Sequence, residues 1–190
     1  IADGFDLADS FVFNPHKWMF TNFDCSAYFV RNADDLIKTF TITPEYLKTK
    51  QDEKVNNYRD WGIQLGRRFR ALKLWFVIRS YGLEGLQSKI RQHLKLAKEF
   101  ERKMSEDPSF ELLAPVQFNT TCFRYKPNGY SGDLDKLNEQ LIEKINASGK
   151  IYISHTKLNG IYTLRFVVAQ TNTEERHVLQ AFDLIKEIAG

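Results

Sequence analysis

The sequence has few cysteines and no long apolar run, and both absences limit the kind of protein it encodes. Two of its 190 residues are cysteines, Cys25 and Cys122, far apart in the chain. That pattern predicts reduced thiols in a cytoplasmic protein and not a disulfide framework. No apolar stretch approaches the roughly 18 to 20 residues of a membrane span, and no basic segment followed by an apolar run indicates a signal peptide. We therefore expect no membrane association and no export.

An excess of charge of one sign is also missing. The sequence has 27 Lys and Arg residues against 24 Asp and Glu residues, a net charge of +3, which gives no reason to expect a nucleic-acid partner. Residues 46–103 hold a local excess of 15 basic over 6 acidic side chains. A nucleic-acid surface there is conceivable, but most of these side chains fall on the outer faces of expected helices. We prefer the solvated-helix interpretation, and we expect no metal site.

Hydrophobic residues make up 43% of the chain and aromatic residues 14%, enough for a packed core. Strands are expected from Ser10 and over 25–30, because both stretches are rich in aromatic and β-branched residues. Pro15 makes residues 14–24 a connecting loop. After a short helix at 33–40, residues 41–60 lack periodicity and predict a long loop, of a kind that often serves as a lid.

The remaining pattern alternates helices and strands. Apolar residues at helical spacing predict a helix from Leu65 to Phe76, which ends at Gly82, and a second helix from about Leu83 to Met104. Further strands are expected at 110–114, 117–125, 151–154 and 162–170, with helices at about 134–145 and from Thr173, the last with Thr171 and Glu174 spaced as a capping box. The second half therefore predicts an α+β domain with helices on one face of a mostly antiparallel sheet.

Residues 14–18 (NPHKW) are the most informative segment for chemistry. A lysine between two buried strands is partly desolvated, which lowers its pKa and leaves a nucleophilic amine able to form a Schiff base. His16 could orient a ligand or move protons, and Ser10 and Asn14 could bond a phosphate. If only the spacing of these residues is considered, the more common explanation is that the lysine and histidine are neighbours on a surface loop and have no function there.

A longer match changes this interpretation. Residues 10–31 (SFVFNPHKWMFTNFDCSAYFVR) resemble the cofactor-lysine segment of the group II pyridoxal-phosphate-dependent amino acid decarboxylases, in particular the aromatic L-amino acid branch that includes DOPA, tyrosine and tryptophan decarboxylases. The resemblance continues in the same order and spacing through PEYLKTK at 44–50, the run at 58–82 and YTLRFVVAQTNTEE at 162–175.

The resemblance implies an α/β fold. Residues 1–82 would end the large domain of a fold-type I transferase that depends on pyridoxal 5'-phosphate (PLP), with the catalytic loop at about 41–60. Residues 83–190 would form the small α+β C-terminal domain, including its leading helix. The implied reaction is decarboxylation of an aromatic L-amino acid to its amine and CO2, with PLP as the electron sink.

The same resemblance implies roles for single residues. Lys17 forms the Schiff base with PLP, and Ser10 and Asn14 contact the cofactor near its phosphate. His16 precedes the lysine as in the family, with local packing as its alternative role. Arg59 and Arg165 could pair with carboxylates, Arg165 because related glutamate enzymes use an arginine in a similar strand. A structural ion pair is the alternative for both.

Tyr46 and Gly66 bear on the choice of reaction and substrate. Tyr46 lies in the segment that resembles the family's mobile loop, which closes over the neighbouring subunit's site, and its phenol is a candidate proton donor. Related aldehyde synthases carry phenylalanine there, so Tyr46 favours simple decarboxylation; an ordinary loop aromatic is the alternative. Gly66 matches a position that reaches the partner's cofactor and substrate, where glycine leaves room for a catechol, phenol or indole. Inside a helix it costs about 1 kcal/mol relative to alanine, and tight helix packing is its alternative role.

Parts of the family's site are not found. In the family, three features lie upstream of the lysine: the acidic residue that pairs with the pyridine nitrogen, the residue that stacks on the ring, and the helix N-terminus that binds the phosphate. Sixteen residues precede Lys17, and Asp3, Asp6 and Asp9 are too close to it to serve. We therefore expect the C-terminal part of a homodimeric decarboxylase, either truncated, cleaved or accompanied by a separate N-terminal chain, and inactive without that N-terminal portion. An aromatic acetaldehyde synthase, or a catalytically silent subunit-association module using the helices around 61–104, are the alternatives.

Overall fold

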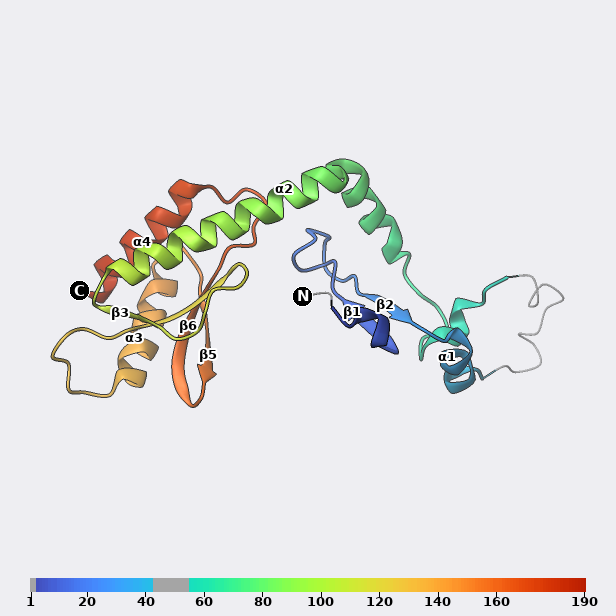
Figure 1. Ribbon diagram of the computed structural model, residues 1–190, viewed down its shortest axis with the longest axis horizontal. Coiled ribbons are helices and arrows are strands. Elements are labelled where there is room, and N and C mark those ends of the chain that lie inside the picture. The colour runs from blue at the N-terminus through green and yellow to red at the C-terminus, as the bar shows by residue number, and fades with distance from the viewer. Residues whose placement is uncertain (1–2, 43–54) are drawn as a thin grey trace. The chain divides into compact units, whose positions relative to one another are not determined.

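The computed structural model describes residues 3–42 and 55–190 (Figure 1). Its contacts divide the chain into two compact units, residues 1–82 and 83–190. Helix α2 (Arg70–Glu106) contributes to both units, and Gly82 interrupts it with φ 64° and ψ 176°. These angles are outside the helical region and suit glycine, so the helix break predicted at Gly82 is confirmed. The predicted start is wrong, since Leu65 precedes the first helical residue.

The first unit is built on a two-stranded antiparallel ribbon. Strand β1 (Ser10–Phe13) pairs with β2 (Ala27–Val30), with Ser10 opposite Val30. A short 3-10 helix η1 (Phe5–Leu7) precedes the ribbon, and helix α1 (Ala33–Phe40) and the 3-10 helix η3 (Tyr58–Trp61) follow it. The predicted strands and the helix at 33–40 are confirmed. Their predicted burial is wrong, because β1 and β2 hold only exposed and half-buried residues.

The second unit holds a four-stranded antiparallel sheet in the order β3-β4-β6-β5. The strands are β3 (Phe110–Leu112), β4 (Thr120–Tyr125), β5 (Ser154–Leu158) and β6 (Ile161–Val167), and the helices after β4 and β6 are α3 (Leu134–Ala147) and α4 (Glu175–Ala189). Phe100 of α2 stacks on Phe166 at 3.9 Å between ring centroids and meets Phe123 edge-on at 5.8 Å. The buried core joins this sheet face to α2, α3 and α4, as predicted (Figure 1).

Two local predictions in this unit are wrong. The strand expected at 151–154 begins only at Ser154, because the backbone N–H and C=O of Ile153 bond the Asn146 side chain at 2.9 and 3.0 Å. The capping box of α4 consists of Glu174 and His177, whose Nδ1 accepts the Glu174 N–H at 3.0 Å. Thr171 lies outside this arrangement, since the helix begins at Glu175.

Across the described ranges, no helix is both long and apolar enough to cross a bilayer. Cys25 and Cys122 are both free thiols. Among residues 3–42 and 55–190, no group of three or more His, Cys, Asp or Glu side chains is arranged to hold a metal ion.

Candidate active site

The candidate site is the turn that connects β1 to β2 and carries Lys17. Three backbone hydrogen bonds fix its path: Lys17 N–H to Asn14 C=O at 2.9 Å, Thr21 N–H to Pro15 C=O at 3.1 Å, and His16 N–H to Cys25 C=O at 3.2 Å. Pro15 and Cys25 are buried beneath the turn. Although the segment has no regular secondary structure, its backbone conformation is well determined by these contacts.

Lys17 is exposed at this turn. Its amine has no hydrogen bond or ion pair with any residue of the described ranges. The desolvation predicted from two buried flanking strands is therefore not observed, because the ribbon is itself exposed within this chain. An amine without a carboxylate partner is chemically suited to attack an aldehyde carbon.

His16 is hydrogen-bonded to Cys25, which lies in the part of the turn that leads into β2. Its ring Nδ1 lies 2.7 Å from the Cys25 carbonyl oxygen and 3.1 Å from the Cys25 nitrogen. Phe23 meets the imidazole edge-on, with ring centroids 4.9 Å apart. The local packing role is thus observed, and a contact of His16 with a ligand would have to use Nε2.

Ser10 is the first residue of β1, and Asn14 directly follows the last. The Ser26 hydroxyl donates to Asn14 Oδ1 at 2.6 Å, which leaves the amide NH2 of Asn14 as the donor available to a ligand. An NH2 donor suits an anionic phosphate oxygen. Ser10 is exposed and pairs with Val30 in the ribbon.

Three other predicted site residues belong to the region before α2. Tyr46 lies outside the described residues. Gly66 is exposed in an irregular segment, and a Cβ there would meet no atom within 4 Å. Its predicted place inside a helix is therefore wrong, since α2 begins at Arg70. Arg59 lies 3.6 Å from the Asp60 carboxylate in η3, so its alternative role as a structural ion pair is observed.

Arg165 belongs to the second unit, on β6. It is the cross-strand neighbour of Cys122 on β4. Because side chains alternate along a strand, both lie on the sheet face opposite to Phe123 and Leu164, which pack against the helices. Burial raises the pKa of the Cys122 thiol, and the charge of Arg165 partly opposes this effect. A role of Arg165 in the site stays a prediction.

Sequence reasoning missed the ion-pair cluster of Asp24 with Arg68 and Arg70. Asp24 lies in the returning leg of the Lys17 turn, and Arg70 Nε donates to its carboxylate at 3.0 Å. Arg68 contacts the other carboxylate oxygen. The only sequence signal was an acidic residue inside the quoted 10–31 segment and arginines more than 40 positions later.

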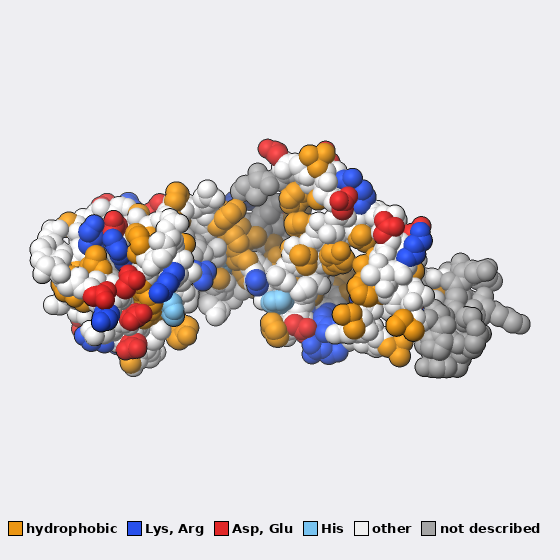
Figure 2. All heavy atoms as spheres, turned by 90° about the horizontal axis from the view of Figure 1, so that it is seen from below, with side chains coloured by type: hydrophobic (Ala, Val, Ile, Leu, Met, Phe, Trp, Pro, Cys, Tyr) orange, Lys and Arg blue, Asp and Glu red, His pale blue; other side chains and the backbone are white. Residues whose placement is uncertain are grey.

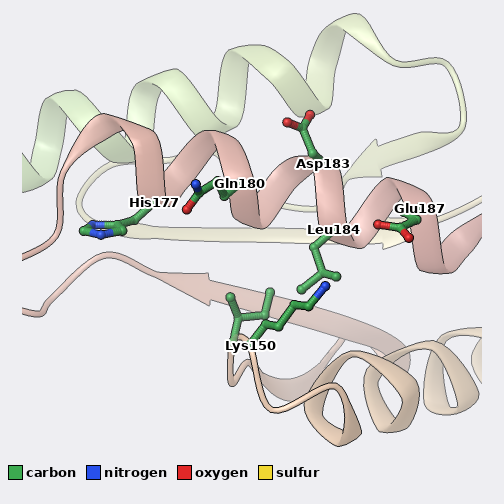
Figure 3. A pocket seen from close by; sticks show the side chains of 7 residues that line it. Lys150, His177, Gln180, Asp183, Leu184 and Glu187 are labelled. Atoms are coloured by element: carbon green, nitrogen blue, oxygen red, sulfur yellow. The ribbon is translucent and has the colours of Figure 1, made fainter.

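A cavity of about 530 Å³ lies in the second unit, between α4 and the residues that follow α3. Figure 3 shows Leu184 directed toward Lys150, and the lining side chains are Lys150, Ile151, His177, Gln180, Asp183, Leu184 and Glu187. His177 Nδ1 is already used in the α4 cap. Lys150 also carries an amine here, but the lining residues lie between positions 150 and 187, outside residues 10–31, the segment that resembles the cofactor-lysine region. We therefore place the candidate chemistry at the turn.

This chain has a mixed α/β fold and an unpaired lysine on a turn between two strands. Enzymes that bind a cofactor covalently through a lysine form one class of protein with these features. The pyridoxal-dependent decarboxylase conserved domain matches residues 1–126, and the chain belongs to this family. Tyrosine decarboxylase 2 of Narcissus pseudonarcissus is 47% identical over 195 residues, covering 98% of this chain and 38% of the relative. Phenylacetaldehyde synthase of Arabidopsis thaliana is 47% identical over 191 residues, covering 99% and 39%.

A solved structure shares the fold. The crystal structure of Oryza sativa TDC with PLP and tryptamine superimposes with a TM-score of 0.93 at 38% identity, covering 99% of this chain and 40% of that chain. The predicted α/β fold of a PLP-dependent decarboxylase is thereby confirmed. The chain spans about two fifths of the length of these relatives.

Proposed function

We propose that this chain is the lysine-bearing part of a PLP-dependent carboxy-lyase that converts an aromatic L-amino acid to its amine and CO2. The observation that carries the proposal is the exposed, unpaired Lys17 amine on a backbone-fixed turn within the family's matched region. A tyrosine decarboxylase and a tryptamine-bound structure among the similar proteins support an aromatic substrate.

The donor groups of the turn fit the cofactor. Lys17 Nζ provides the amine that binds the aldehyde carbon, and the Asn14 NH2 is a free donor for a phosphate oxygen. Ser10 adds a hydroxyl at the start of β1. When bound, PLP supplies an electron-accepting ring beside the bond that breaks. His16 braces the turn through Nδ1, and Tyr46 is the proposed proton donor to the substrate carbon.

We also propose that residues 1–82 complete a PLP-binding large domain together with an N-terminal portion, that 83–190 form the small domain, and that the whole enzyme is a cytoplasmic homodimer. Gly66 and Arg165 are proposed to face the substrate, and Gly66 also the cofactor. Apolar surface supports a missing neighbour, because Phe69 and Phe76 are 74% and 56% exposed. Figure 2 shows hydrophobic side chains exposed on the face of the molecule in view. Large exposed apolar areas mark interaction sites.

Borohydride trapping tests the proposal. The complete enzyme, incubated with PLP and reduced with sodium borohydride, is expected to carry a phosphopyridoxyl group on Lys17, because reduction makes the lysine–cofactor bond permanent. Peptide mass mapping locates the modified residue. Exposed Lys38 on α1 is the internal control and should stay unmodified. Absence of the label from Lys17 would reject the enzyme proposal in favour of the silent module.

An aldehyde synthase is the second candidate, since phenylacetaldehyde synthase is as similar to this chain as tyrosine decarboxylase 2. The two differ in products: the decarboxylase releases amine, whereas the synthase consumes O2 and releases aldehyde, ammonia and hydrogen peroxide. We expect the wild-type enzyme to release amine, because it carries tyrosine at position 46.

Replacement of Tyr46 by phenylalanine is expected to shift the products. Loss of the phenol proton donor should lower amine formation by about 10²-fold, within the range for a general acid, and aldehyde should rise. Chromatography of amine and aldehyde, with peroxide measured in parallel, gives the ratio. Tyr58→Phe is the matched control, because Tyr58 is an exposed tyrosine of η3. An unchanged ratio in Tyr46→Phe would remove Tyr46 from this role.

A further inference from the structure

Asp24 connects the Lys17 turn to the first residues of α2. Its Oδ2 accepts a hydrogen bond from Arg70 Nε at 3.0 Å, and its Oδ1 contacts Arg68. Arg70 is the first residue of α2, so the contact joins segments 46 positions apart in the chain. Cys25 Sγ lies 4.0 Å from the Arg70 carbonyl oxygen and adds a second contact between the same segments.

The contact continues to the lysine through the backbone. Asp24 is bonded covalently to Cys25, whose N–H and C=O both meet the His16 ring, at 3.1 and 2.7 Å to Nδ1. The same Cys25 carbonyl accepts the His16 N–H at 3.2 Å. His16 immediately precedes Lys17. A short series of contacts thus runs from α2 through Asp24, Cys25 and His16 to the turn that carries the amine.

The charges favour this arrangement. Burial would raise the pKa of Asp24, but the hydrogen bond from Arg70 and the positive charges of Arg68 and Arg70 outweigh it and lower that pKa. Arg70 is the stronger partner, because its side chain is 26% exposed against 71% for Arg68, and exposed pairs contribute little.

We propose that Asp24, held by Arg70, is a positioning residue that sets the location of the Lys17 amine for its reaction with the cofactor and substrate. The proposal rests on the proposed function of Lys17. Asp24 itself does not have to touch the cofactor. A small displacement of a reacting group is enough to lower a rate by about 10²-fold, so loss of this tether should affect the chemical step more than substrate affinity.

The test compares the complete wild-type enzyme with Asp24→Asn, which keeps the shape of the side chain and removes its charge. We expect kcat to fall by about 10- to 100-fold with KM changed less than about threefold. The rate of borohydride-trapped labelling at Lys17 should fall in parallel. Arg70→Gln should have a similar effect, the double variant should add little, and Asp24→Glu should restore part of the rate.

Arg102→Gln is the matched control, because Arg102 on the same helix contacts two carboxylates, Glu99 and Glu106, at 2.5 and 2.6 Å. Rates are taken per folded site, so a variant that only loses stability keeps its kcat. If Asp24→Asn does not fold, Arg70→Lys, which keeps the charge but loses the planar guanidinium, replaces it in the same assays. Normal labelling and kcat in the Asp24 or Arg70 variants, or equal losses in Arg102→Gln, overturn the positioning role. Absence of label in the wild type instead overturns the role of Lys17.

Discussion

Lys17→Ala in the complete enzyme is expected to lower kcat by about 10⁴-fold or more, the size of loss seen when an essential covalent or acid–base group is removed. The change removes the only amine side chain of the turn, and an amine is the group that forms a Schiff base with an aldehyde. PLP added to the variant is expected to give no borohydride-stable label on the chain at this turn. Amine release measured by chromatography, and the mass of the turn peptide, check both statements.

Two further variants control this experiment. Lys17→Arg keeps the positive charge but should be as inactive as Lys17→Ala, because a guanidinium does not form the covalent bond. Lys38→Ala removes an exposed lysine of the same unit and should retain wild-type kcat. Substantial activity in Lys17→Arg would show that charge, and not covalent chemistry, is what position 17 contributes.

The sequence predicted element types well and some boundaries poorly. Apolar spacing located α3 and α4, and Gly82 gave the break in α2, because these signals are local. The prediction placed strand β5 too early in the chain. Asn159 and Gly160, with φ 51° and 83°, form the hairpin turn between β5 and β6, and this signal was not used. An Asn-Gly pair is a strong hairpin signal, and it marks the strands on either side of it more reliably than apolar composition does.

The candidate site was predicted less completely than the fold. Residues 14–18 made Lys17 the candidate nucleophile, because the chemistry of an amine and the resemblance both point to one short segment, and its role stays a prediction. The ion pair of Asp24 with Arg70 was not predicted, since it joins positions 46 apart and only the folded chain brings them together. The burial of Lys17 was predicted wrongly, because the ribbon that carries its turn has only two strands, whose residues are exposed or half-buried.

The two parts of α2 differ in how far their apolar side chains are buried. Its first part, before Gly82, exposes Trp75 and Phe76 by 54% and 56%, whereas Phe100 and Met104 in the second part are fully buried. Within residues 3–42 and 55–190, the apolar stripe of α2 is therefore buried in its second part only. Stability of residues 83–190 should consequently depend on a few large side chains of the second part.

Phe100→Ala is expected to lower the free energy of unfolding by about 3–5 kcal/mol, the usual cost of removing a fully buried phenylalanine. Phe100 is 0% exposed, stacks on Phe166 and meets Phe123 edge-on, so alanine leaves a cavity between α2 and the sheet. Denaturant unfolding followed by circular dichroism gives the change, and Tyr152→Ala, at a tyrosine 84% exposed, should stay within about 0.5 kcal/mol of the wild type. A loss below about 1 kcal/mol in Phe100→Ala would mean that the helices and sheet of this unit do not share the core described above.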